Sequence, residues 1–212
     1  MQNKMRDAFK HFSIDRITGL IKVDQYITKT YFKTFAPAAP IVSDVNLYVT
    51  STNMALTTYT IATPSPSDAL CRNVCVAVST VGGVADTMGT VLVTGTDYND
   101  EVITETITPV SGARVEGKKA FKTVTAAISS GWVRDGAGGT EDTIEIGCGS
   151  NIGMPEIVES KDILFTVWNQ VSSATLPTFA FGPTVSDCTV TLPEAGNSAK
   201  KLIVYYTKYT GH

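Results

Sequence analysis

The sequence predicts an all-β protein: an antiparallel β-sandwich or jelly roll, preceded by an N-terminal arm that is extended or contains a short helix. Three observations favour this class. β-Branched residues alternate with a period of two along much of the chain. Clusters of Gly, Pro and Asn interrupt this alternation about every 8 to 15 residues. No amphipathic helical pattern is found beyond residue 40, which argues against a βαβ fold.

The clearest predicted feature is a hairpin in the middle of the chain. Residues 91–94 and 102–108 each alternate Val, Ile, Leu and Thr, and residues 95–100 between them are rich in Gly, Asp and Asn. Asn and Asp tolerate the backbone conformations that tight turns require. We therefore expect two antiparallel strands joined at residues 95–100.

The other strands are predicted from the same alternation and from the turn residues that flank it. A long turn is expected at residues 147–155, where glycines recur. Surface turns are expected at residues 63–68, 82–83 and 193–197. The remaining strands are expected within residues 41–60, 73–80, 120–125, 143–146, 163–167, 184–192 and 200–209.

Residues 1–36 are predicted to form an N-terminal arm, and residues 41–212 the β-sandwich body. Residues 1–35 hold seven basic and three acidic side chains, net +4, whereas residues 36–212 hold ten basic and seventeen acidic ones, net −7. The sequence APAAP at residues 36–40 predicts a stiff linker, because each proline fixes its own backbone dihedral.

The arm is rich in aromatic side chains, which favours docking on a neighbouring subunit over a solvated tail. The residues expected to make this contact are Phe9, Phe12, Tyr31, Phe32 and Phe35. Met5, Phe9 and Phe12 have the spacing of a short amphipathic helix. The alternative is an ordinary first helix and strand packed on the body. If the segment is a docking arm, a chain beginning at Ala39 is expected to fold without it.

Composition and charge exclude several classes of protein. Charged residues make up 17% of the chain, against about 25% in a typical domain, which suits a surface that contacts other subunits. A net charge of −3 argues against general nucleic-acid binding. Neither an 18-residue apolar run nor a secretion signal is present, so we expect no membrane span and synthesis in a cytoplasm. The four cysteines lack zinc-site spacing and are expected to be buried thiols.

No catalytic, cofactor or metal motif is recognised, and we expect a protein that is not an enzyme. The two histidines, His11 and His212, lie in the arm and at the last position, where a folded cleft is not expected. The acidic groups at residues 97–101 and 141–145 could supply oxygen ligands to Ca²⁺ or paired carboxylates to a glycosidase. We favour turn formation and solvated strand positions for them. Lys118, Lys119 and Lys122 are interpreted as a solvated strand edge.

Three phrases of the sequence resemble structural proteins of tailed-bacteriophage virions. They are VTGTDYNDEVITETIT at residues 93–108, KKAFKTVTAAI at 118–128 and DTIEIGCGSNIGMP at 142–155. The nearest resemblance is to auxiliary head proteins, which decorate or cement the capsid. The glycine usual in the first turn of that family is replaced here by Asn99 and Asp100.

The resemblance implies a capsid decoration or cement protein on the virion surface, assembled in the host cytoplasm. Its expected partners are the major capsid protein and further copies of itself, as a homodimer or homotrimer. One alternative is a carbohydrate-binding or adhesin β-module of a tail fibre, for which Trp132 and Trp168 are the candidate ligand-stacking residues. Another is a tail-tube or adaptor protein.

Overall fold

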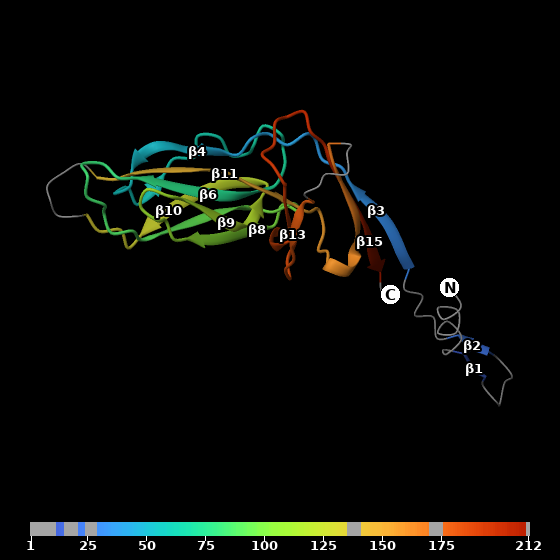
Figure 1. Ribbon diagram of the computed structural model, residues 1–212. Helices are drawn as coiled ribbons and strands as arrows, with labels where there is room; N and C mark the ends of the chain where they lie inside the picture. The colour runs from blue at the N-terminus through green and yellow to red at the C-terminus, as the bar shows by residue number, and fades with distance from the viewer. Residues whose placement is uncertain (1–11, 15–20, 24–28, 135–140, 170–175, 211–212) are drawn as a thin grey trace. The chain divides into compact units, whose positions relative to one another are not determined.

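The computed structural model of the chain describes residues 12–14, 21–23, 29–134, 141–169 and 176–210. The chain divides into two compact units. One comprises Met1–Phe32 with Thr207–His212, and the other, here called the body, comprises Lys33–Tyr206. The described residues form β-strands, turns and two short 3₁₀ segments (Figure 1).

The first unit contains a small antiparallel hairpin. Strand β1 (Phe12–Ile14) pairs with β2 (Ile21–Val23), with Phe12 opposite Val23. The helix predicted from Met5, Phe9 and Phe12 lies outside the described residues except for Phe12, which begins β1. The division of the chain into these two units falls within the residues of strand β3 (Lys29–Phe35) and of the last strand, β15 (Leu202–Thr210).

The body consists of three antiparallel sheets. A four-stranded sheet has the order β5-β10-β7-β8, a six-stranded sheet includes β13-β14-β11-β6-β9 with β4 paired to β11, and a three-stranded sheet has the order β12-β15-β3. The strands not yet bounded are β4 (Asp44–Asn53), β5 (Thr58–Tyr59), β6 (Arg72–Ser79), β7 (Thr90–Thr96), β8 (Val102–Ile107), β9 (Arg114–Phe121), β10 (Thr123–Ser130), β11 (Thr143–Gly153), β12 (Ile163–Trp168), β13 (Thr178–Ala180) and β14 (Thr189–Thr191).

The four-stranded and six-stranded sheets face each other across the main hydrophobic core, which confirms the predicted antiparallel sandwich. In β7, Val91 and Val93 are fully buried and alternate with outward-facing residues. They pack in one cluster with Val74 and Val76 of β6 and with Phe121 at the end of β9. Alternating burial of this kind is what a sheet with one covered face requires.

A second hydrophobic cluster fills the other end of the body. It joins Ile152 and Met154, at the end of β11, to Trp168 of β12 and to Leu202 and Val204 of β15. The three-stranded sheet therefore covers the end of the six-stranded sheet, as Figure 1 shows for β15 and β3.

A carboxylate bridges the two sheets of the sandwich along one side. Glu105 of β8 accepts hydrogen bonds from the backbone N–H groups of Lys118 (2.6 Å) and Lys119 (3.2 Å) in β9. These N–H groups belong to the outermost strand of the six-stranded sheet. Glu105 thus satisfies an edge that would otherwise be open to unwanted strand pairing.

The structure corrects three of the predicted elements. The strand predicted at residues 184–192 contains a 3₁₀ segment, Val185–Asp187, and only Thr189–Thr191 is extended as β14. The segment predicted as one strand at residues 120–125 is the junction of β9 and β10, where the N–H of Lys122 donates to the Thr96 carbonyl. The turn predicted at residues 147–155 is instead strand β11 as far as Gly153. A Cβ on Gly147 would lie 1.9 Å from the Asp44 carbonyl oxygen, so this glycine permits close approach to β4 and does not mark a turn.

We predict that Phe121→Ala lowers the free energy of unfolding of the body by about 3–5 kcal/mol, because it leaves a cavity in the main core. Phe121 is fully buried. Urea unfolding followed by circular dichroism measures the effect. The control is Val102→Ala, whose side chain is 75% exposed and whose loss should cost under about 0.5 kcal/mol. Equal losses in the two variants would contradict this core.

Candidate functional site

A buried ion pair lies where the N-terminal segment of the body meets the sandwich. The side chains of Arg72 and Asp68 are only 1% and 2% exposed, and their closest N–O distance is 2.6 Å. Arg72 also donates to the backbone carbonyls of Ile41 (2.9 Å) and Gly149 (3.1 Å). Every contact made by this guanidinium is with a group of opposite partial or full charge, as a buried charge requires.

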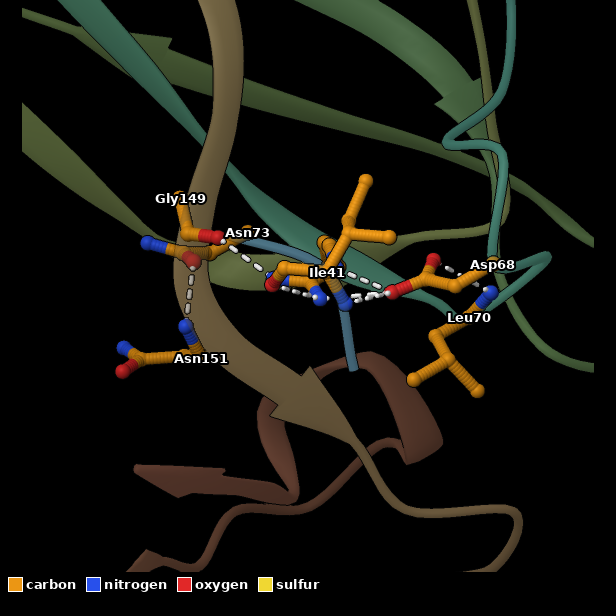
Figure 2. A network of polar contacts seen from close by, with 7 residues as sticks. Ile41, Asp68, Leu70, Asn73, Gly149 and Asn151 are labelled. Atoms are coloured by element: carbon orange, nitrogen blue, oxygen red, sulfur yellow. Dashed lines mark hydrogen bonds and ion pairs between the residues drawn. The ribbon is translucent and has the colours of Figure 1, made fainter. Parts of the chain in front are cut away.

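Asp68 also accepts hydrogen bonds from two backbone N–H groups, one in the segment of Ile41 and one in its own turn. Its Oδ2 accepts from the N–H of Ile41 (3.0 Å) and its Oδ1 from that of Leu70 (3.2 Å). Figure 2 shows these residues converging on one centre from different parts of the chain. Arg72 and Asp68 together fix Ile41 through both its N–H and its carbonyl oxygen.

The polar network continues through Asn73, which is also fully buried. Its amide nitrogen donates to the Gly117 carbonyl (2.9 Å) and to the Glu116 carboxylate (2.5 Å). Its Oδ1 accepts from the N–H of Asn151 (2.9 Å), as Figure 2 shows. The side chain thereby links β6 to both of its neighbours, β9 and β11.

The segment predicted to be a linker is therefore attached to the body. Besides the contacts of Ile41, the buried Pro40 accepts a backbone hydrogen bond from the N–H of Ser198 (2.9 Å). The two prolines at residues 37 and 40 lie within the compact body, which begins at Lys33.

The residues predicted to dock on a partner have different environments. Phe32 is 79% exposed and Tyr31 46% exposed. Phe35 is only 7% exposed and belongs to the second hydrophobic cluster. The ring of Phe35 packs within the body, and a docking role for this residue stays a prediction. Phe9 lies outside the described residues, and so does the side chain of Phe12.

The acidic groups considered as Ca²⁺ or glycosidase sites have structural roles. Asp97 accepts from the N–H groups of Asn99 (2.8 Å) and Glu101 (3.1 Å), which closes the hairpin turn as predicted. The buried Asp142 accepts from the N–H groups of Val81 (2.9 Å) and Asp86 (3.0 Å). Among the residues that the structure describes, no three His, Cys, Asp or Glu side chains are grouped as a metal site would need.

Neither tryptophan considered for carbohydrate stacking lies open on the surface. Trp168 is 2% exposed, and its indole N–H donates to Glu194 (2.8 Å). Trp132 packs against the main core. A shallow groove of about 500 Å³ lies elsewhere, with Asn151 and the partly exposed Phe181 in its lining.

The outer face of the four-stranded sheet was not identified from the sequence. Ile128 of β10 and Thr106 of β8 lie directly opposite Leu92 of β7, and all three are exposed. The next outward-facing pairs along these strands, such as Thr94 with Thr104, are also uncharged. No residue of this face is charged. We call it the neutral face, and its residues are Thr58, Thr90, Leu92, Thr94, Thr96, Val102, Thr104, Thr106, Thr123, Ala126, Ile128 and Ser130.

A charged pair borders one end of the neutral face. Lys122 and Asp100 are ion-paired at 2.6 Å beside the hairpin turn. An uncharged centre with a charged border is the usual composition of a protein–protein interface. The sequence holds part of the signal, since Thr104 and Thr106 alternate in β8, but such alternation also follows from strand propensity alone.

The four cysteines are all buried and none forms a disulfide. Burial raises the pKa of Cys71 and of Cys75 to about 12, and that of Cys148 is raised for the same reason. The thiols of Cys71, Cys75 and Cys148 are therefore neutral near pH 8 and poor nucleophiles.

Comparisons with protein-family models, curated proteins and solved structures gave no match to this chain. In the described part of the chain, no helix has the length and apolar character needed to cross a membrane.

We predict that Asp68→Ala lowers the free energy of unfolding by about 3–5 kcal/mol, because it leaves the Arg72 charge buried without its counter-ion. Chemical unfolding measures this. The control is Asp100→Ala, which breaks an exposed ion pair and should cost less than about 1 kcal/mol. Replacing both charges, Asp68→Leu with Arg72→Met, should recover part of the loss. A double variant no more stable than Asp68→Ala would contradict the electrostatic explanation.

We predict that the four thiols react slowly with a thiol-specific reagent at pH 8 in the folded protein, and that all react at once after denaturation without reductant. Burial in the folded protein raises the pKa of Cys71 and Cys75 from 9.0 to about 12. The folded state therefore favours the neutral thiols. The free energy of unfolding keeps its full value below pH 9 and decreases as the pH rises from 9 towards 12. Detection of only two thiols in the denatured protein would reveal a disulfide.

Proposed function

We propose that this chain is a structural protein of a tailed-phage virion that binds the assembled capsid as a decoration or cement protein. The observation that carries this proposal is the exposure of Phe32 and Tyr31 in β3, at the end of a basic N-terminal segment. A fully packed strand would bury such aromatic rings, and exposed ones are typical of binding surfaces.

The resemblance to virion proteins supports the same function. The first of the three phrases covers most of β7 with all of β8, the second covers the β9–β10 junction, and the third covers β11. These are framework strands of the sandwich, so the resemblance concerns the body of the protein. The N-terminal arm would supply the contact with the major capsid protein.

The mechanism proposed for stabilisation is mass action. A protein that binds the assembled shell, and not its separated subunits, stabilises the shell by the free energy of binding. An extended arm can add a strand to an exposed sheet edge on the shell, with its aromatic side chains in pockets. The net charge of +4 on residues 1–35 would orient the arm on an acidic surface, and salt would weaken this effect.

A carbohydrate-binding role in a tail fibre is the second candidate, and one observation favours it. Phe181 is stacked near Phe179, with ring centroids 6.0 Å apart, and lines the groove beside Asn151. An exposed aromatic ring next to amide and carboxylate groups can bind a sugar ring. This candidate predicts oligosaccharide binding that Phe181→Ala abolishes.

We predict that the double variant Tyr31→Ser, Phe32→Ser loses at least about tenfold in affinity for empty phage shells, equivalent to about 1.4 kcal/mol. The measurement is cosedimentation of the full chain with shells of the phage that encodes it. Tyr98→Ser is the control, since Tyr98 is exposed to a similar extent (44%) but belongs to the body. Failure of the unmodified chain to sediment with shells would overturn the proposed function. Full binding by the double variant would overturn the role of the arm.

A further inference from the structure

The neutral face is chemically complementary to itself. Most of its residues are threonines, and each hydroxyl can both donate and accept a hydrogen bond. Thr96 and Thr123 already make such a bond across β7 and β10, with their hydroxyl oxygens 2.7 Å apart. Two copies of a surface built from such groups can satisfy each other without a second type of residue. A contact across a two-fold axis needs this property.

Charge also favours a second copy as the partner at this face. Residues 36–212 carry a net charge of −7, so two bodies generally repel each other. Where no side chain is charged, two copies can meet without placing like charges in contact. A charge-free face also offers no electrostatic complementarity with which to select a charged foreign protein.

The shape and position of the apolar residues suit face-to-face packing of two sheets. Leu92 and Ile128 lie opposite each other on adjacent strands, with Thr58 beyond Ile128 and Thr106 beyond Leu92. This row places the two largest apolar side chains near the middle of the sheet. Sheets that pack face to face interdigitate such side chains over a gap of about 10 Å.

The size of the face sets the expected strength of the contact. Three strands of six to eight residues, spaced about 4.8 Å apart, and the two-residue β5 beside them give a footprint of roughly 350 Å² per copy. A stable interface buries about 800 Å² per partner. A contact of this size alone is therefore weak and depends on concentration, unless other contacts in an assembly hold the copies together.

We propose that the neutral face is a self-association surface, and that its partner is the same face of a second copy of this chain. The contact is isologous, with Leu92 of each copy close to the two-fold axis. This inference does not depend on the proposed function, because it rests on the sheet alone.

Sedimentation velocity on the full chain, at concentrations up to about 1 mM, tests the proposal. The unmodified chain should show concentration-dependent dimers. Leu92→Glu and Leu92→Lys should each be monomeric, because like charges would meet across the axis. An equimolar mixture of the two variants should form dimers again, and added salt should weaken them.

Charges introduced on a different sheet test whether the loss of dimers is specific to the neutral face. Leu164→Glu and Leu164→Lys introduce the same charges at an exposed leucine of β12, in a different sheet, and should dimerise like the unmodified chain. Far-ultraviolet circular dichroism establishes that the Leu92 variants are folded, as expected for an outward-facing position.

Three outcomes would overturn the proposal. One is an unmodified chain that stays monomeric at the highest concentration. Another is dimerisation that the Leu92 variants leave unchanged, which would mean that copies meet at another surface. The third is a mixture of the two Leu92 variants that stays monomeric, which would mean that the face contacts a different surface of its partner.

Discussion

The buried charge of Arg72 is the constraint on which the arrangement of the body most depends. A guanidinium that is 1% exposed must have its donors matched by acceptors, or the cost of burial exceeds what a domain of this size can absorb. Here the acceptors come from Asp68, Ile41 and Gly149. Ile41 lies in the first segment of the body, Asp68 in the loop before β6, and Gly149 in β11. One charge therefore fixes three separate parts of the chain.

The network also explains how one sheet contributes to two cores. Strand β6 begins at Arg72, and its next residue, Asn73, bonds to both neighbouring strands. Beyond Asn73, Val74 and Val76 enter the main core, while Ile152 of β11, opposite Arg72, enters the second. The polar network thus lies at the boundary between the two clusters, and it binds β11 where its register against β6 shifts, between Cys148 and Ile152. Packing alone would specify this register less strictly, since hydrophobic contacts are not directional.

Most strands could be predicted from the sequence because each has one buried face, which imposes a period of two. β7 and β8 are the clearest examples. The length of β11 could not be predicted, since a glycine needed for close approach to β4 has the same appearance in a sequence as a turn glycine. β13, at three residues, is too short for alternation to be recognised.

The candidate surfaces were predicted less completely than the fold. Aromatic content singles out Tyr31, Phe32 and Phe35 alike. It cannot indicate that Phe35 is buried, because that burial depends on strands far away in the sequence. The neutral face could be recognised only once strand pairing placed β10 beside β7. The sequence shows one sign of the Arg72 network, which is a charged residue at the start of a largely apolar strand. The partners of Arg72 depend on tertiary contacts.

Native-state hydrogen exchange at the amides of Ile41 and Leu70 tests the role of the network most directly. Both amides donate to the Asp68 carboxylate from segments that are not strands. If the buried pair fixes these segments, both amides should exchange as slowly as that of Val76 in the core, through global unfolding. Exchange at the rate of exposed turn residues such as Gly83 would show that the segments open independently, and would contradict the central place given to Arg72.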